Sequence, residues 1–154
     1  MKKKILTLMF LLLVAPIIAF GAGSVTLSSD VGGSFYTFTW TCTSDASGDI
    51  SGEGEIVATG YPYQVEVIPD DAGDVIFTGN NQPTTGFNVE LRGTLNEDVL
   101  YDVTSACSNS ALTRGTPLTS SGGLVLLKGD TLTPYASGVG NAKKFYLKVK
   151  IIKP

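Results

Sequence analysis

The feature that most constrains the fold is an alternating run of side chains within residues 34–54, which also holds the single tryptophan of the chain. Tyr36, Phe38, Trp40 and Cys42 occupy every second position, and threonine fills most of the positions between them. Successive side chains of a β-strand point to opposite faces, so this pattern predicts a strand with one face against a core. The Ser, Asp and Gly residues that follow favour a tight turn.

Most of the remaining chain consists of short apolar or alternating runs separated by turn-forming residues. The strands or extended pieces predicted from these runs cover residues 24–29, 50–58, 63–68, 87–91, 99–103, 124–127 and 145–152. Residues 59–62 are predicted to form a turn, and Glu66 is predicted to face solvent. The inward positions of the two clearest runs are Phe87, Val89, Leu91, Phe145, Leu147, Val149 and Ile151. With no helical period, the pattern favours one all-β domain, a β-sandwich or a jelly-roll-like fold.

The N-terminal region has the composition of a secretory signal peptide. Three lysines at positions 2–4 precede an uncharged apolar run over residues 5–20, and small residues follow it. We therefore expect residues 1–21 to be cleaved off, which leaves residues 22–154 as a single domain. A retained membrane anchor is the alternative, but the run has 16 residues and contains a proline. A spanning helix needs about 20 apolar residues.

The charge of the exported part argues against some classes of partner. Without the three N-terminal lysines, 8 basic residues remain against 14 acidic ones, a net charge of −6. Nucleic-acid binding requires clustered Lys and Arg, so we expect no nucleic-acid partner. The same charge disfavours binding to anionic membranes, which leaves contact with a membrane only during export.

Cys42 and Cys107 are the only two cysteines in the sequence. In an exported protein, a pair of cysteines most often forms one disulfide, so we predict a Cys42–Cys107 bridge. The alternative is two separate buried thiols. A zinc site is not expected, because the chain has no histidine and two thiolates do not complete a zinc shell.

The sequence offers no catalytic motif and no cofactor site. Without histidine, the common nucleophile–base pairs are excluded, and no Gly-x-Ser-x-Gly elbow is present. We expect neither a resident cofactor nor a metal. Asp70, Asp71 and Asp74 form an acidic loop whose oxygens could hold calcium, although a solvated turn explains the same residues.

Two groups of residues are candidates for contacts between subunits. Lys143, Lys144, Lys148 and Lys150 cluster near the C-terminus and could meet an acidic neighbouring subunit. Their alternative role is to charge an edge strand and so prevent aggregation. Val25 and Leu27 lie on the first strand after the predicted cleavage site, which could be donated to a neighbour or could be an ordinary edge strand.

Five segments, taken in order, resemble a group of small bacteriophage proteins described as virion structural proteins. They are residues 40–52, 67–73, 83–91, 98–100 and 140–142 (WTCTSDASGDISG, VIPDDAG, PTTGFNVEL, DVL and GNA). The resemblance implies an all-β structural component with no catalytic residues. This chain differs by its export signal and by the Cys after the Trp-Thr pair, which suggests a related domain used outside a cell.

These observations favour a non-enzymatic, secreted structural subunit that self-assembles into a homo-oligomer, a fibre or a virion-like particle. The alternative is a monomeric extracellular β-sandwich that binds carbohydrate or a surface partner. Exposed aromatic residues would carry that binding, and the candidates are Tyr61, Tyr63, Tyr101 and Tyr135. An enzyme is the least favoured class, because the sequence lacks histidine and a nucleophile motif.

Overall fold

The computed structural model describes residues 23–70, 82–101, 103–119 and 121–154, and these residues form eight β-strands. The strands are β1 (Ser24–Gly32), β2 (Phe35–Thr43), β3 (Ile50–Ser51), β4 (Ile56–Pro69), β5 (Asn88–Arg92), β6 (Thr113–Gly115), β7 (Leu127–Ser137) and β8 (Lys144–Ile152). All of their pairings are antiparallel. The described residues include no helix that is long and apolar enough to span a membrane.

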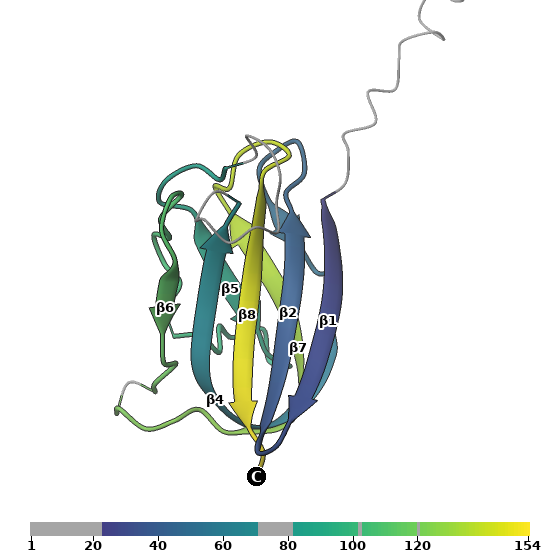
Figure 1. The fold of residues 1–154 in the computed structure, drawn as a ribbon, viewed down its shortest axis with the longest axis vertical. Helices are drawn as coiled ribbons and strands as arrows, with labels where there is room; N and C mark the ends of the chain where they lie inside the picture. Colours follow the sequence, from purple (N-terminus) through teal and green to yellow (C-terminus); the bar gives the residue numbers. More distant parts are fainter. Residues whose placement is uncertain (1–22, 71–81, 102, 120) are drawn as a thin grey trace, which may run out of the picture.

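The strands belong to one sheet that curls around its own core. The order along the sheet is β1-β2-β8-β4-β7-β3, with β5 beside β7 and β6 beside β4. Figure 1 shows β1, β2, β8 and β4 side by side in one layer, with β5 and β7 behind them. The prediction of a single all-β domain is therefore confirmed, and its architecture is a curled antiparallel sheet resembling half a barrel.

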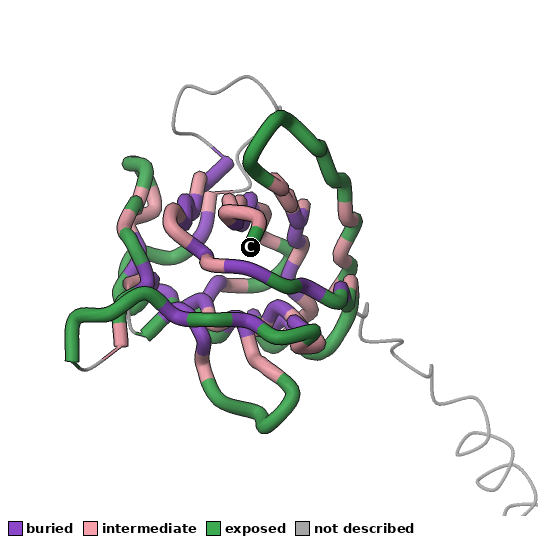
Figure 2. Tube along the Cα trace, turned by 90° about the horizontal axis from the view of Figure 1, so that it is seen from below, coloured by how far each residue is buried: buried purple, intermediate pink, exposed green. Residues whose placement is uncertain are grey.

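The curled sheet has two flanks: one holds β1, β2, β8 and the second part of β4, and the other holds the first part of β4, β7, β5 and β3. The core lies between these flanks, where the buried segments gather in Figure 2. The inward positions predicted on β2 and β8 are confirmed, since Trp40 is fully buried opposite Leu147. The inward positions predicted around β5 are buried as well. Tyr36 and Phe38 are only half-buried, but both pack against the core cluster.

The predicted turn at residues 59–62 is wrong, because β4 runs without interruption through this segment. The first part of β4 pairs with β7 and the second part pairs with β8. The register shifts between Ala58 and Thr59 and again between Pro62 and Gln64. Such bulges bend a strand and accommodate residues that usually occur in turns. Here they let one strand join the two flanks of the sheet.

Several smaller predictions also differ from the structure. Glu66, expected to face solvent, is buried because Arg114 of β6 covers it with an N–O distance of 2.7 Å. Val99 lies in a turn and not in a strand, and Leu124 and Leu126, expected in a buried strand, are exposed. The predicted strand over residues 50–58 is split at Gly52 and Gly54, both of which have positive φ.

Replacing Gly60 with alanine should strongly destabilise the fold. Gly60 has φ +130°, and a Cβ there would lie 2.1 Å from the carbonyl oxygen of Ile152. Backbone strain and overpacking together should lower the free energy of unfolding by about 2–5 kcal/mol, measured by urea denaturation. Gly32→Ala is the control, because a Cβ at Gly32 meets no atom within 4 Å. Equal stability of the two variants would contradict the close approach of the Ile152 backbone to Gly60.

Candidate functional site

β1 is the outermost strand of its flank and pairs along its whole length with β2. Two contacts show how its backbone is oriented. The Val25 N–H donates to Oε2 of Glu53 at 3.3 Å, away from β2, and the Lys153 N–H donates to the Ser34 carbonyl oxygen at 3.0 Å, which directs the even-numbered residues of β2, the partners of odd-numbered β1 residues, toward β8. Because backbone groups alternate in direction along a strand, the odd-numbered residues of β1 point away from β2.

The outward-pointing backbone of Leu27, Ser29 and Val31 forms an open strand edge, here called the β1 edge. Within the part of the chain that the structure describes, β2 is the only strand paired with β1. The side chain of Leu27 is half-buried, Ser29 is exposed, and Val31 is 62% exposed. The β1 edge therefore combines unpaired hydrogen-bonding groups with an exposed apolar side chain, which favours pairing with another chain.

The flank that carries β5 ends differently, because residues 97–101 and 103–107 cover the outer side of this strand. Backbone hydrogen bonds of 3.1, 2.9 and 2.7 Å cross this edge, from Val89 N–H to Thr104, from Val99 N–H to Leu91, and from Cys107 N–H to Phe87. A loop that supplies both donors and acceptors in this way replaces a neighbouring strand. The outer side of β5 is therefore sealed.

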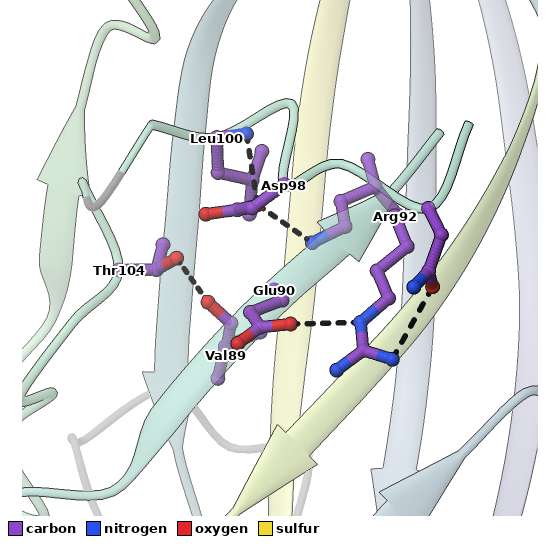
Figure 3. A network of polar contacts seen from close by, with 8 residues as sticks. Val89, Glu90, Arg92, Asp98, Leu100 and Thr104 are labelled. Carbon is purple, nitrogen blue, oxygen red and sulfur yellow. Dashed lines mark hydrogen bonds and ion pairs between the residues drawn. The ribbon is translucent and has the colours of Figure 1, made fainter. Parts of the chain in front are cut away.

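Two polar side chains complete this seal, as Figure 3 shows. Oδ1 of Asp98 accepts hydrogen bonds from the N–H groups of Leu91 at 3.2 Å and Leu100 at 3.0 Å. The hydroxyl of Thr104 is buried and donates to the carbonyl oxygen of Val89 at 2.5 Å. The remaining outer strands, β3 and β6, have only two and three residues. β1 is thus the one long open edge among the described residues.

The lysines predicted to mediate assembly do not lie at an edge. β8 pairs with β2 on one side and with β4 on the other, so the alternative of a charged edge strand is wrong for Lys148 and Lys150. Lys148 lies opposite Glu66, and Lys150 donates from Nζ to Gln64 at 3.1 Å, both on the outer face of the sheet. Val25 and Leu27 pack against the core on the inner face, opposite to the face that carries Lys144, Lys148 and Lys150, and Lys143 precedes β8.

The structure contains no Cys42–Cys107 disulfide, because both residues are free thiols. Both are buried in the core, and Cys42 lies opposite Phe145 while Cys107 pairs with Phe87. Loss of solvation by burial raises the pKa of Cys42 to about 12 and that of Cys107 to about 11. The alternative of two buried thiols describes the structure, and the predicted bridge is corrected accordingly.

The tyrosines proposed for carbohydrate binding lie on three different elements: Tyr61 and Tyr63 on β4, Tyr135 on β7 and Tyr101 in a turn. Tyr135 lies in a shallow depression of about 210 Å³ between β5, β7 and β3. The guanidinium carbon of Arg92 sits 4.0 Å from the centre of its ring and so occupies one face of that ring. Tyr63 packs against Phe35 with ring centres 5.1 Å apart, and Tyr101 is exposed on a turn. Tyr61 is at the position of β4 opposite Ile152.

Of the acidic loop proposed for calcium, Asp71 and Asp74 lie outside the described residues. Asp70 is buried at the end of β4, and its N–H donates to the carbonyl oxygen of Lys144 at 3.3 Å. No group of three potential metal ligands occurs among the residues with described positions.

Comparison of this chain with protein-family models, with curated proteins and with solved structures gives no match. The candidate function therefore depends on the geometry of the chain itself.

The residues that distinguish open from sealed edges were not identified from the sequence. Glu53, Asp98 and Thr104 are polar residues in segments without periodicity, and their partners lie on other strands. Only Asp98 carries a local signal, because an Asp that accepts a hydrogen bond from the N–H two residues later is common in turns. Hydrogen bonds between segments far apart in the sequence leave no local residue pattern from which they could be predicted.

Replacing Asp98 with alanine should destabilise the protein by unsealing β5. The N–H groups of Leu91 and Leu100 would lose their shared acceptor, and an unpaired buried donor costs about 1–3 kcal/mol. Thermal and urea denaturation should show this loss. Asp98→Asn is the matched control, because its side-chain oxygen still accepts hydrogen bonds. Equal destabilisation by both changes would show that charge, and not the acceptor, matters here.

The two cysteines should react slowly with thiol reagents while the protein is folded. At pH 8 a thiol with a pKa near 11 is ionised in only about one molecule in 1,000, and burial also blocks access. We expect no alkylation by iodoacetamide in the native state and two alkylations in guanidinium without reductant, measured by intact mass. Protection that persists in guanidinium and disappears with reductant would instead demonstrate a disulfide.

Proposed function

We propose that this protein is a non-enzymatic, exported structural subunit that self-assembles through the β1 edge. The assembly would be extracellular or virion-like, either a fibre or a particle. The observation that carries the proposal is the contrast between the two flanks: β5 is sealed by backbone and side-chain contacts, whereas the β1 edge is open. Proteins commonly bind extended partners by adding a strand to such an edge.

The position of β1 in the chain supports the same proposal. It begins at Ser24, directly after the segment expected to be removed during export. Cleavage would leave the open strand as the first element of the exported protein. The finer description of the fold as a β-sandwich fits this picture, with β1 at the rim of the larger layer. The side of β1 that faces away from β2 would then be accessible to a neighbouring subunit.

The chemistry of the chain supports a structural and not an enzymatic role. The sequence contains no histidine, and burial raises the pKa of both thiols, which makes them poor nucleophiles. The alternative function, carbohydrate binding, would use the depression beside Tyr135, which is lined by Asn88 and Glu90. Arg92 already covers one face of the tyrosine ring, so only the other face of the ring remains for stacking with a sugar.

Replacing Ser29 with proline should abolish assembly without unfolding the subunit. The Ser29 N–H points away from β2, so proline removes a donor from the β1 edge and leaves the β1–β2 ladder intact. The wild-type protein should form oligomers in sedimentation experiments at high concentration, and the variant should remain monomeric with an unchanged circular dichroism spectrum.

Ser29→Ala is the matched control, because it keeps the backbone donor and should assemble as the wild type does. A wild-type protein that stays a monomer at every concentration would overturn the proposal. Oligomers of undiminished size in Ser29→Pro would place the contact on another surface.

A further inference from the structure

We infer that the partner of the β1 edge is a second copy of the same chain, paired antiparallel about a two-fold axis with Ser29 opposite Ser29 of that copy. This inference rests on the proposed self-assembly, and it specifies the partner, the symmetry and the register. It makes the basic unit of the assembly a dimer in which one sheet runs continuously through both subunits.

The first step is the choice of the partner edge. A head-to-tail contact would need a different open edge on the neighbouring subunit. Among the described strands, the outer side of β5 is sealed, and β3 and β6 are too short to match β1. The remaining long edge is β1 itself, and pairing an edge with a copy of itself produces two-fold symmetry.

The second step is to find which residues of the two antiparallel β1 strands can face each other. In an antiparallel ladder, hydrogen-bonded pairs join residues whose backbone groups point at each other. The outward residues of β1 are the odd-numbered ones, so Leu27, Ser29 and Val31 must pair with odd-numbered residues of the partner. This condition leaves a small set of two-fold registers, centred on Leu27, Ser28, Ser29 or Asp30.

The third step eliminates three of these registers. Centres at Leu27 and at Ser28 both bring Val25 into the new ladder, but the Val25 N–H already donates to Glu53. A centre at Asp30 sets this carboxylate directly against its symmetry mate, and like charges opposite each other are destabilising. The register centred on Ser29 uses only the open part of the edge and leaves the contact with Glu53 undisturbed.

This register also gives complementary side-chain pairs on both faces of the sheet. On the inner face, Leu27 lies opposite the partner's Val31, so the most exposed apolar side chain of β1 gains an apolar neighbour. On the outer face, Asp30 lies opposite the partner's Ser28, whose hydroxyl can rotate away from the Thr39 carbonyl to donate to the carboxylate. Three hydrogen-bonded pairs contribute about six backbone hydrogen bonds across the axis.

A cysteine at position 29 tests the register directly. In the inferred dimer the two Cα atoms of residue 29 face each other in a hydrogen-bonded pair, about 5.5 Å apart, within the range of about 4.4–6.8 Å that a disulfide spans. Ser29→Cys should therefore form a covalent dimer under mild oxidation, seen by intact mass and by non-reducing electrophoresis. The two native thiols are buried, so the wild-type protein should give no covalent dimer.

Ser28→Cys is the matched control on the adjacent residue. In the inferred register, position 28 faces position 30 of the partner, and the two copies of residue 28 are diagonal neighbours roughly 7–8 Å apart, too far for an unstrained bridge. We expect at least a tenfold lower yield of covalent dimer than for Ser29→Cys. Efficient crosslinking of Ser28→Cys but not of Ser29→Cys would overturn the register in favour of a centre at Ser28.

The remaining outcomes separate this inference from the proposed function. If the wild-type protein forms oligomers in sedimentation and neither variant crosslinks, the two-fold pairing is overturned while self-assembly through another contact stands. If the wild-type protein is monomeric and neither variant crosslinks, both ideas fail. Circular dichroism of each cysteine variant shows whether it folds, and dependence of the Ser29→Cys yield on protein concentration supports a specific dimer over random collision.

Discussion

Every open β-sheet leaves backbone N–H and C=O groups of its outermost strands without a partner strand, and the two flanks of this sheet treat these groups differently. A closed barrel has no edges, but this sheet curls only part of the way round and keeps two flanks. On the β5 flank, a loop with Asp98 and Thr104 provides substitute hydrogen-bond partners. On the β1 flank, Glu53 accepts from one donor, and among the described residues no strand other than β2 pairs with β1. The candidate function follows from that asymmetry.

The curl itself depends on local irregularities in β4. This strand has to leave one flank and enter the other, and it does so at two register shifts around Gly60. Because a Cβ at Gly60 would collide with the backbone of Ile152, the glycine allows β4 and β8 to approach closely at the bend. Trp40 then fills the enclosed space, and its indole N–H donates to the carbonyl oxygen of Gly54 at 2.6 Å. Curvature and core packing are thus coupled through a few positions.

The sequence predicts the strands that alternate clearly, and it fails where a strand breaks that pattern. Trp40, Leu91 and Leu147 are predicted inward from a period of two, and all three are fully buried. The turn residues near Gly60 led to a false break in β4, because bulges use the same residue types as turns. Glu66 was misplaced because Arg114, 48 positions away, covers it. The polar contacts that seal β5 also join separated segments, so local pattern could not reveal them.

The absence of a bridge between Cys42 and Cys107 changes what holds the domain together. Without that crosslink, stability depends on the packing of the curled sheet, where Phe87 and Phe145 meet with ring centres 5.3 Å apart beside the two thiols. A subunit that is stabilised by its own core can leave one edge unpaired and remain folded before it meets a partner. The proposed pairing at the β1 edge would add hydrogen bonds without rearranging the core, because the edge backbone is already extended and held by β2.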